Sequence, residues 1–208
     1  MRHGILVRVS VAVVILVFAI GTWVKGGKFD PGWLKFFSAA VLLATIVFAL
    51  WDLWLWKIRP SQLFPGVPRR IGGTWKGTLT SFWEDPATGR RAAPKTVYLV
   101  VRQTASLVSV KLLTNESRSA SSLAAVSTVD GTSELAYLYL NRPDPRFEEG
   151  SRMHHGSTVL SLSGEPVSRM RGRYWTDRDT RGELNFHQWT AEFIDDFDEA
   201  QSVFDKRV

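Results

Sequence analysis

The sequence predicts a two-helix transmembrane hairpin followed by an all-β domain, an antiparallel up-and-down β-barrel of about eight strands. Two observations support this fold class. The first 56 residues hold two long apolar runs joined by a short polar turn, whereas the later chain consists of short alternating segments separated by turn residues. Roughly 150 residues remain without the hairpin, which is the size of one ordinary domain.

The first apolar run, residues 5–24, is long enough to cross a bilayer, because 20 helical residues extend about 30 Å. The second run, residues 34–56, follows the helix-stopping sequence Asp30-Pro31-Gly32. A cleaved signal peptide is the alternative for the first run, but Thr22-Trp23-Val24 is too bulky for a cleavage site. Tryptophan rings favour the membrane interface, and five of the nine lie at the ends of the runs: Trp23, Trp33, Trp51, Trp54 and Trp56.

Two spans place both chain ends on one side of the membrane. The flanks on that side hold Arg2, Arg8, Lys57, Arg59, Arg69 and Arg70, whereas the turn holds Lys25 and Lys28. Since basic flanks stay in the cytosol, this excess predicts a cytosolic position for the large domain. Residues 57–70 are punctuated by proline and are interpreted as a linker.

The β-strand domain is predicted over residues 71–190. Its expected strands are 73–83, 95–103, 106–114, 117–129, 134–141, 156–163, 168–176 and 183–190. A closed barrel is favoured over a sandwich because closure removes exposed strand edges, and eight strands leave room for one small ligand. The opening Gly73-Thr74-Trp75 is similar to the first strand of lipocalin-type barrels, in which the tryptophan plugs one end.

Two further segments complete the predicted organisation. The irregular stretch 141–155 contains two prolines and mixed charge, and is interpreted as a lid or a surface loop. Residues 191–208 form an acidic C-terminal tail or short helix. Its phenylalanines Phe193, Phe197 and Phe204 are separated by acidic residues, which favours an amphipathic helix packed on the barrel rim.

The sequence lacks the patterns of several enzyme classes. It contains no cysteine, no phosphate-binding P-loop, no G-x-S-x-G elbow and no H-E-x-x-H motif. The pairs His154-His155, Glu148-Glu149 and Asp195-Asp196 are interpreted as ordinary surface residues, so neither a metal site nor an acid–base pair is expected. The chain is therefore predicted to be a binder, with no enzymatic activity and no cofactor.

Charge also limits the partners. Residues 71–190 carry 15 Lys and Arg against 12 Asp and Glu, which does not predict binding to a long nucleic acid. Tyrosines and basic residues within the strands instead suit a small anionic nucleotide, because arginine forks onto phosphate oxygens and flat rings stack on bases. The candidate ligand-binding residues are Lys76, Tyr98, Arg102, Lys111, Arg118, Tyr137, Tyr139, Arg171, Arg173 and Tyr174.

Strand alternation restricts this set. Tyr137 and Tyr139 share one face of a strand, so both lie inside the barrel or both lie outside. Arg173 and Tyr174 face opposite ways, so at most one of them enters the interior.

The order of these parts resembles the two-transmembrane, β-strand-rich, STING-like effectors of bacterial cyclic-oligonucleotide-based antiphage (CBASS) systems. The resemblance covers nearly the whole chain. It rests on the two apolar runs, the short basic linker and a domain that opens with Gly73-Thr74-Trp75-Lys76-Gly77. The domain then closes with Gly172-Arg173-Tyr174-Trp175 and Arg181-Gly182-Glu183-Leu184.

Membership would imply a receptor that binds a cyclic dinucleotide made by a partner nucleotidyltransferase. It would also imply a homo-oligomer that disrupts the lipid bilayer, and a multi-pass location in the bacterial inner membrane with both termini in the cytoplasm. Two alternatives remain open at this point: a membrane-tethered lipocalin-like carrier of a lipid or other apolar ligand, and a structural envelope protein with a filled barrel.

Overall fold

The computed structural model describes residues 2–24, 26, 33–64, 66–86, 88–129, 131–147 and 152–206. The chain divides into two compact units, residues 1–67 and 68–208. Several sequence predictions, namely the turn residues Lys25, Lys28 and Asp30-Pro31-Gly32 and the pair Glu148-Glu149, lie outside the described residues.

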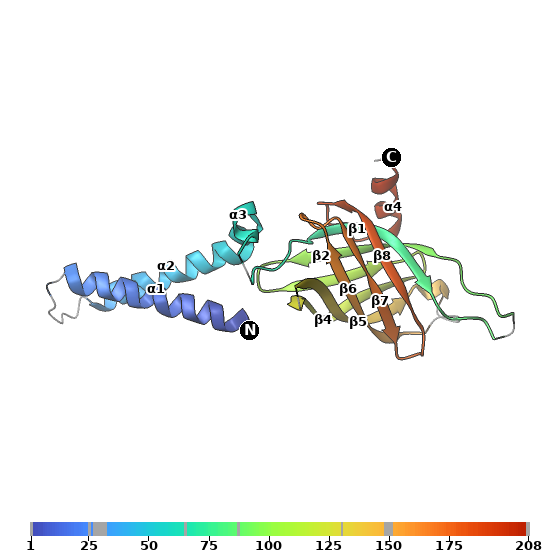
Figure 1. Cartoon of the computed structure of the whole chain (residues 1–208), viewed down its shortest axis with the longest axis horizontal. Helices are drawn as coiled ribbons and strands as arrows, with labels where there is room; N and C mark the ends of the chain where they lie inside the picture. Colours follow the sequence, from blue (N-terminus) through green and yellow to red (C-terminus); the bar gives the residue numbers. More distant parts are fainter. Residues whose placement is uncertain are drawn as a thin grey trace. The chain divides into compact units, whose positions relative to one another are not determined.

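The first unit is helical. Helices α1 (Arg2–Val24) and α2 (Trp33–Leu53) lie side by side, with Ala40 and Ala44 of α2 buried (Figure 1). The second helix ends before the predicted residue 56, and a 3-10 turn η1 (Leu55–Lys57) follows. The short helix α3 (Arg59–Gln62) lies inside the segment predicted as a linker. Its first turn contains Pro60, a residue that is tolerated at the start of a helix.

Among the described residues, no helix combines the length and the apolar character that crossing a membrane requires. The predicted multi-pass location in the bacterial inner membrane is wrong on this finding, and the transmembrane hairpin is not confirmed. The physical requirement is about 20 consecutive apolar residues.

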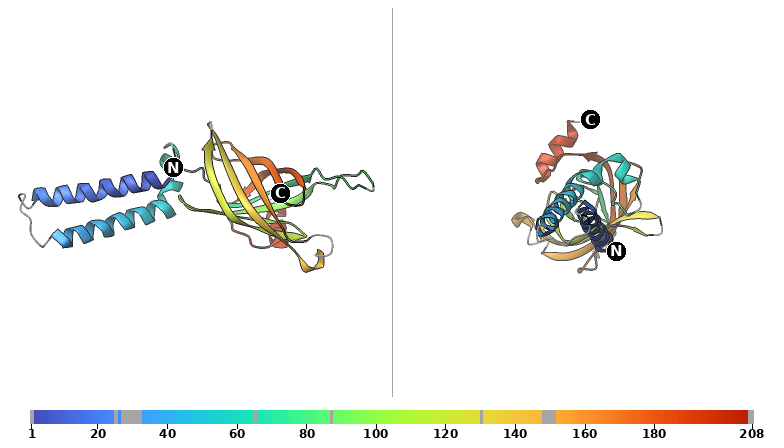
Figure 2. Two further views of the ribbon diagram at one scale, coloured as in Figure 1. Left: turned by 90° about the horizontal axis from the view of Figure 1, so that it is seen from below. Right: turned by 90° about the vertical axis from the view of Figure 1, so that its left-hand side faces the viewer.

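The second unit is a closed antiparallel barrel in which each strand pairs with the next and the last pairs with the first (Figure 2). Its strands are β1 (Gly73–Ser81), β2 (Lys95–Gln103), β3 (Val108–Leu113), β4 (Ser117–Val129), β5 (Thr132–Pro143), β6 (His154–Ser163), β7 (Arg169–Thr176) and β8 (Arg181–Thr190). The eight-stranded antiparallel barrel is therefore confirmed. Strand ends differ from the predicted ones by a few residues. Side chains close some of the turns: the Thr114 hydroxyl donates to the Ser117 carbonyl and accepts from the Ser117 N–H.

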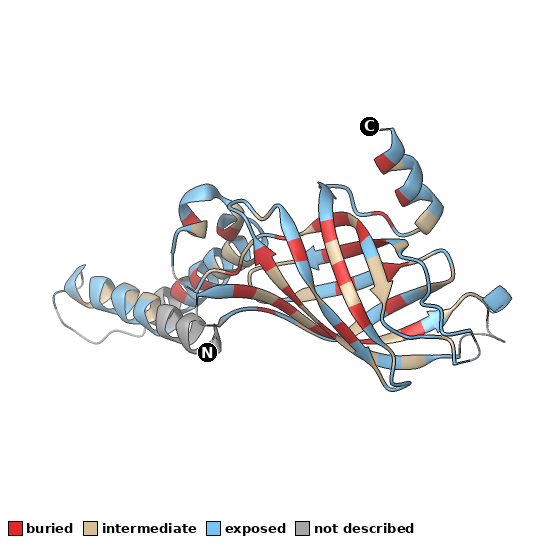
Figure 3. Ribbon diagram, turned by 45° about the vertical axis from the view of Figure 1, so that its right-hand side comes forward, coloured by how far each residue is buried: buried red, intermediate tan, exposed pale blue. Residues whose placement is uncertain are grey.

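Buried and exposed residues alternate along the strands, as Figure 3 shows. The inward positions form one apolar core. Near the end where β1 begins, Trp75 is buried and its indole Nε1 donates a hydrogen bond of 2.9 Å to the Ile71 carbonyl. This placement agrees with the expected tryptophan plug.

Three glycines on the inner wall lie beside large rings. Gly77 contacts Phe186, Gly156 pairs with Tyr139 and Gly182 pairs with Tyr174. A Cβ atom added to any of them would lie within 2.6 Å of the neighbouring ring. Because the glycines have no side chain, the rings lie against the wall and the barrel accommodates them.

The C-terminal segment packs on the outer wall and not on the rim. Helix α4 (Phe197–Asp205) begins at the cap residue Asp196, whose Oδ1 accepts hydrogen bonds from the backbone N–H groups of Asp198 and Glu199. Phe204 is buried, whereas Phe193 is half exposed. A small apolar cluster joins this segment to β2 and β3 and comprises Tyr98, Val100, Leu113, Ile194, Ala200 and Phe204.

Candidate functional site

A cavity of about 410 Å³ lies at the barrel mouth formed by the end of β7 and the start of β8. It is lined by three arginines, three aromatic rings and one glycine: Arg91, Arg173, Arg181, Phe82, Tyr174, Trp175 and Gly182. We refer to it as the mouth pocket. Its volume lies within the usual range for small-ligand sites, roughly 300–1,000 Å³.

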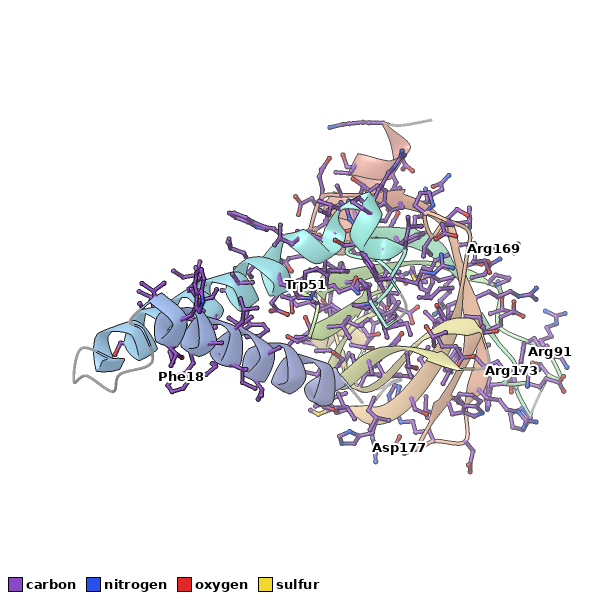
Figure 4. The ribbon with its side chains drawn as sticks, turned by 60° about the vertical axis from the view of Figure 1, so that its left-hand side comes forward. Phe18, Trp51, Arg91, Arg169, Arg173 and Asp177 are labelled. Atoms are coloured by element: carbon purple, nitrogen blue, oxygen red, sulfur yellow. The ribbon has the colours of Figure 1, made fainter. Side chains whose placement is uncertain are left out.

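The mouth pocket is formed by two parts of the chain, the segment between β1 and β2 (residues 82–94) and the paired strands β7 and β8. Backbone and side-chain contacts hold these parts in place. The Phe82 N–H donates a hydrogen bond of 2.8 Å to the Arg181 carbonyl. This bond holds the segment between β1 and β2, which we call the β1–β2 excursion, beside β8. Within that excursion, Arg91 pairs with Glu84 at 2.6 Å, and these two residues also form an isolated β-bridge. The side chains of Arg91 and Arg173 can be located in Figure 4.

Alternation places the pocket residues on both sides of the barrel wall. Tyr174 faces the interior and is buried, while Arg173 and Trp175 on the same strand face outward and are exposed. Gly182 lies directly across from Tyr174, so the ring occupies the space that a side chain would fill. The mouth pocket therefore combines a buried phenol with exposed guanidinium groups.

Behind Tyr174 the interior contains two more tyrosines. Tyr137 and Tyr139 are both buried with their ring centroids 5.8 Å apart. Burial raises the pKa of Tyr137 to about 12, and the neighbouring Thr158 hydroxyl opposes this only in part. Burial also raises the pKa of Tyr139 and of Tyr174, so all three phenols stay neutral hydrogen-bonding groups at physiological pH.

Some polar atoms in this interior lack partners. The Tyr137 hydroxyl and Thr158 Oγ1 are buried and make no hydrogen bond of good geometry to the described residues. Elsewhere in the barrel, Ser119 donates a hydrogen bond of 2.8 Å to Asn141. Unpaired buried hydroxyls are costly, by about 1–3 kcal/mol each.

The predicted hollow interior is largely occupied. Side chains from all parts of the apolar core, including Leu99, Leu160 and Phe186, fill the lumen and are fully buried. One cavity formed by described residues lies at the mouth, and another lies on the outer wall. The glycine–ring pairs explain the difference, since they allow large aromatic side chains to fill a barrel that strand number alone would leave open.

The structure divides the predicted ligand-binding residues into groups. Tyr137, Tyr139 and Tyr174 face the interior, and this agrees with the shared face of Tyr137 and Tyr139 and with the opposite faces of Arg173 and Tyr174. Arg173 and Tyr174 line the mouth pocket. Arg171 faces outward on β7 and pairs with Glu183.

The remaining five lie under or beside the C-terminal segment. Tyr98 is buried on the outer wall, where it packs against Phe197 and Phe204. Four ion pairs join the same wall to the segment: Lys76–Asp205 at 3.2 Å, Arg102–Asp195 at 3.4 Å, Lys111–Asp195 at 2.8 Å and Arg118–Asp196 at 2.7 Å. We call these four basic residues the covered wall.

Sequence reasoning missed five residues of the mouth pocket: Phe82, Arg91, Trp175, Arg181 and Gly182. Trp175 and Arg181 were visible as neighbours of predicted residues, and strand alternation puts Trp175 on the same face as Arg173. Phe82 and Arg91 belong to the β1–β2 excursion, and their approach to β8 depends on the closure of the barrel. No sequence signal locates that contact.

The adjacent histidines of the sequence belong to a strand. His154 and His155 lie on β6 and not in a loop, and the His155 N–H donates to the Asp177 carboxylate at 3.0 Å. Within the part of the chain that the structure describes, no cluster of three or more His, Asp or Glu side chains is arranged to hold a metal ion.

Comparison with known proteins gives two findings. Residues 67–188 match the family described as "Cap15, cyclic dinucleotide receptor domain", and this range covers the barrel strands as far as Gln188. Over 179 residues the chain is 25% identical to CD-NTase-associated protein 15 of Staphylococcus schleiferi. That alignment covers 86% of this chain and 93% of the relative.

Proposed function

The chain belongs to the Cap15 cyclic dinucleotide receptor family, and on this premise we propose that it binds a cyclic dinucleotide in the mouth pocket. The matched range contains all seven pocket residues, which lie on β7, on β8 and in the segment between β1 and β2. In this proposal the chain is a receptor in a CBASS antiphage system and not an enzyme. A linked nucleotidyltransferase supplies its ligand.

One observation carries the proposal: three arginines and three aromatic rings meet in one cavity at the end of the barrel. A cyclic dinucleotide has two phosphodiester groups and two bases. Arg173 and Arg181 provide guanidinium forks for phosphate oxygens, and Phe82 and Trp175 provide flat surfaces for base stacking. An apolar carrier site would need neither kind of group at this density.

The interior tyrosines support the pocket from below. Tyr174 forms part of the pocket wall, and its neutral hydroxyl can donate to a phosphate or a base edge. Gly182 holds this ring against the wall, as described above. In our proposal this pair sets the depth to which the ligand enters the barrel.

Calorimetric titration of the purified chain with a panel of cyclic dinucleotides tests the proposal. The variants R173Q and R181Q should each bind the preferred nucleotide at least about tenfold more weakly, because each loses a charged hydrogen bond to phosphate. The matched control is R169Q. Arg169 lies on the same strand and the same outer face as Arg173 but outside the pocket, so this variant should bind normally.

The outcomes separate the function classes. Absence of binding to every cyclic dinucleotide would contradict the receptor proposal. A lipid that co-purifies and is detected by native mass spectrometry would favour the carrier. Conversion of the nucleotide to a new product, followed by chromatography, would contradict the non-enzymatic role.

A further inference from the structure

The β1–β2 excursion is a small hairpin with its own hydrogen bonds. The Asp85 N–H donates to the Arg90 carbonyl at 3.0 Å, and the Gly89 N–H donates to the Asp85 carbonyl at 2.7 Å. Gly89 has a φ of 65°, which favours glycine at this tight turn. The hairpin extends as a green arm past the ends of the strands (Figure 1, Figure 2). Its backbone therefore fixes the positions of its side chains relative to one another.

Glu84 holds one edge of the Arg91 guanidinium. The two residues face each other across the hairpin in an isolated antiparallel bridge. Glu84 Oε1 accepts a hydrogen bond of 2.7 Å from Arg91 Nε and lies 2.6 Å from Arg91 Nη2. A guanidinium has five N–H donors, and this contact uses the donors of one edge. The donors of the opposite edge can bind a ligand.

The cations of the mouth pocket come from two parts of the chain. Arg173 and Arg181 belong to the barrel wall, whereas Arg91 belongs to the excursion. Arg91 lines the pocket and Glu84 does not, so the guanidinium lies between its carboxylate partner and the cavity. Arg91 and Arg173 are labelled at the same end of the barrel in Figure 4. Guanidinium groups on two separate walls suit a ligand with two separate phosphate groups.

The number of phosphate groups distinguishes cyclic from linear dinucleotides. A cyclic dinucleotide has two phosphodiester groups on opposite sides of its ring, whereas a linear dinucleoside monophosphate with the same bases has one. We propose that Arg91, positioned by Glu84, binds the second phosphodiester and makes the pocket select cyclic over linear dinucleotides. This inference rests on the proposed function, in which Arg173 and Arg181 bind the first phosphodiester.

Glu84 has two opposing effects on this contact. Its negative charge repels the phosphate, but the side chains of Arg91 and Glu84 are 63% and 52% exposed, so water and salt screen the repulsion. Its contact with Arg91 also restricts the rotamers of this long side chain before the ligand arrives, so less side-chain entropy is lost on binding. Because the repulsion is screened and the restriction is not, Glu84 should strengthen binding.

Calorimetric titration of the full chain with matched pairs of compounds tests the role of Arg91. Each pair is a cyclic dinucleotide and its dinucleoside monophosphate, such as cyclic di-AMP with ApA, and weak binders are measured by competition with the cyclic compound. R91Q should bind the cyclic compound about tenfold more weakly and the linear one within about twofold of the wild type. The matched control is R90Q, because Arg90 is an exposed neighbour outside the pocket. R90Q should leave both affinities within about twofold of the wild type.

A double-mutant cycle tests the role of Glu84. E84Q should bind the cyclic compound about threefold more weakly and leave the linear one unchanged, because a loosely held Arg91 loses more entropy. Added to R91Q, E84Q should have no further effect, since Glu84 acts through Arg91. Both side chains are exposed, so thermal unfolding of the variants should match the wild type. A folding defect would lower the bound fraction of both compounds and leave the ratio of their affinities unchanged.

Several results would overturn the inference. Equal loss of both compounds in R91Q, or a wild type that binds both equally, would show that Arg91 does not recognise the second phosphodiester. An effect of R90Q as large as that of R91Q would assign the loss to the net charge of the excursion. Tighter binding by E84Q, or an E84Q loss that persists in R91Q, would remove the positioning role. These results leave the sites of Arg173 and Arg181 in place, whereas a wild type that binds no cyclic dinucleotide would contradict the proposed function itself.

Discussion

The outer face of β7 and the start of β8 carry four exposed arginines, Arg169, Arg171, Arg173 and Arg181, which we call the arginine ladder. The covered wall has the same number of basic residues, yet the surroundings of the two surfaces are opposite. Lys76, Arg102, Lys111 and Arg118 are each paired with the C-terminal segment. The ladder has Glu183 as its neighbouring carboxylate and faces outward. The comparison shows that basic residues on a strand do not by themselves indicate a binding surface. Acidic residues from elsewhere in the same chain can pair with them, as the C-terminal segment does on the covered wall.

The apolar anchor of the covered wall gives the largest expected effect. The variant F204A should lower the free energy of unfolding by about 3 kcal/mol, because Phe204 is buried and stacks on Tyr98. Chemical denaturation measures this change. F193A is the control, since Phe193 is half exposed, and it should cost less than about 1 kcal/mol. If F204A and F193A lowered the free energy of unfolding by the same small amount, the packing of α4 on Tyr98 would contribute little to stability.

Asp196 gives the next effect. Its Oδ1 caps α4 and its Oδ2 accepts a hydrogen bond of 2.7 Å from Arg118, so D196A removes both contacts. We expect a loss of about 1–2 kcal/mol, mostly from the cap. D196N keeps a capping side chain and should recover most of the loss. An equal loss in D196A and D196N would assign the effect to the ion pair.

The same kind of change on the ladder should have little effect. Glu183 is paired with Arg171, and this pair lowers the pKa of Glu183, but the arginine is exposed. E183Q should therefore alter the free energy of unfolding by less than about 0.5 kcal/mol. Thermal unfolding checks this. A loss as large as that of D196A would remove the contrast between the two walls.

The smallest expected effect is a pH dependence of the covered wall. The hydrogen bond and charge of Lys111, with a further contribution from Arg102, lower the pKa of Asp195. The contribution of Asp195 is therefore fully present above the unfolded pKa of about 3.9 and is lost as the pH falls through the lower folded pKa. Hydrogen exchange of the α4 amides between about pH 5 and pH 2.5 follows this loss. D195N should show a weaker dependence.

Much of the barrel could be predicted from local patterns. Alternation fixed the strands, and it also showed that Tyr137 and Tyr139 share a face and that Arg173 opposes Tyr174. These inferences need only the two-residue period of a strand. The barrel was favoured over a sandwich because it removes edges, and the pairing of β1 with β8 confirms that argument.

The candidate site was harder to predict because it depends on contacts between distant residues. Arg118 and Asp196 are 78 positions apart, and Lys76 and Asp205 are 129 positions apart. Single-sequence patterns do not reveal such pairs. The acidic tail was recognised, but its position on the wall was not, so its ion pairs with Lys76, Arg102, Lys111 and Arg118 could not be predicted. Phe82 and Arg91 were omitted for the same reason.

The double role of Asp196 restricts how this chain can change its length. A helix whose first turn and whose anchor to the barrel depend on one carboxylate cannot slide along the wall, because a shift of one residue would separate the two oxygens from their donors. Insertions just before Asp196 would displace Ile194, which is buried in the same cluster, and Asp195, which pairs with Lys111. Insertions after it would rotate Phe204 away from Tyr98, so the spacing from Asp196 to Phe204 is fixed.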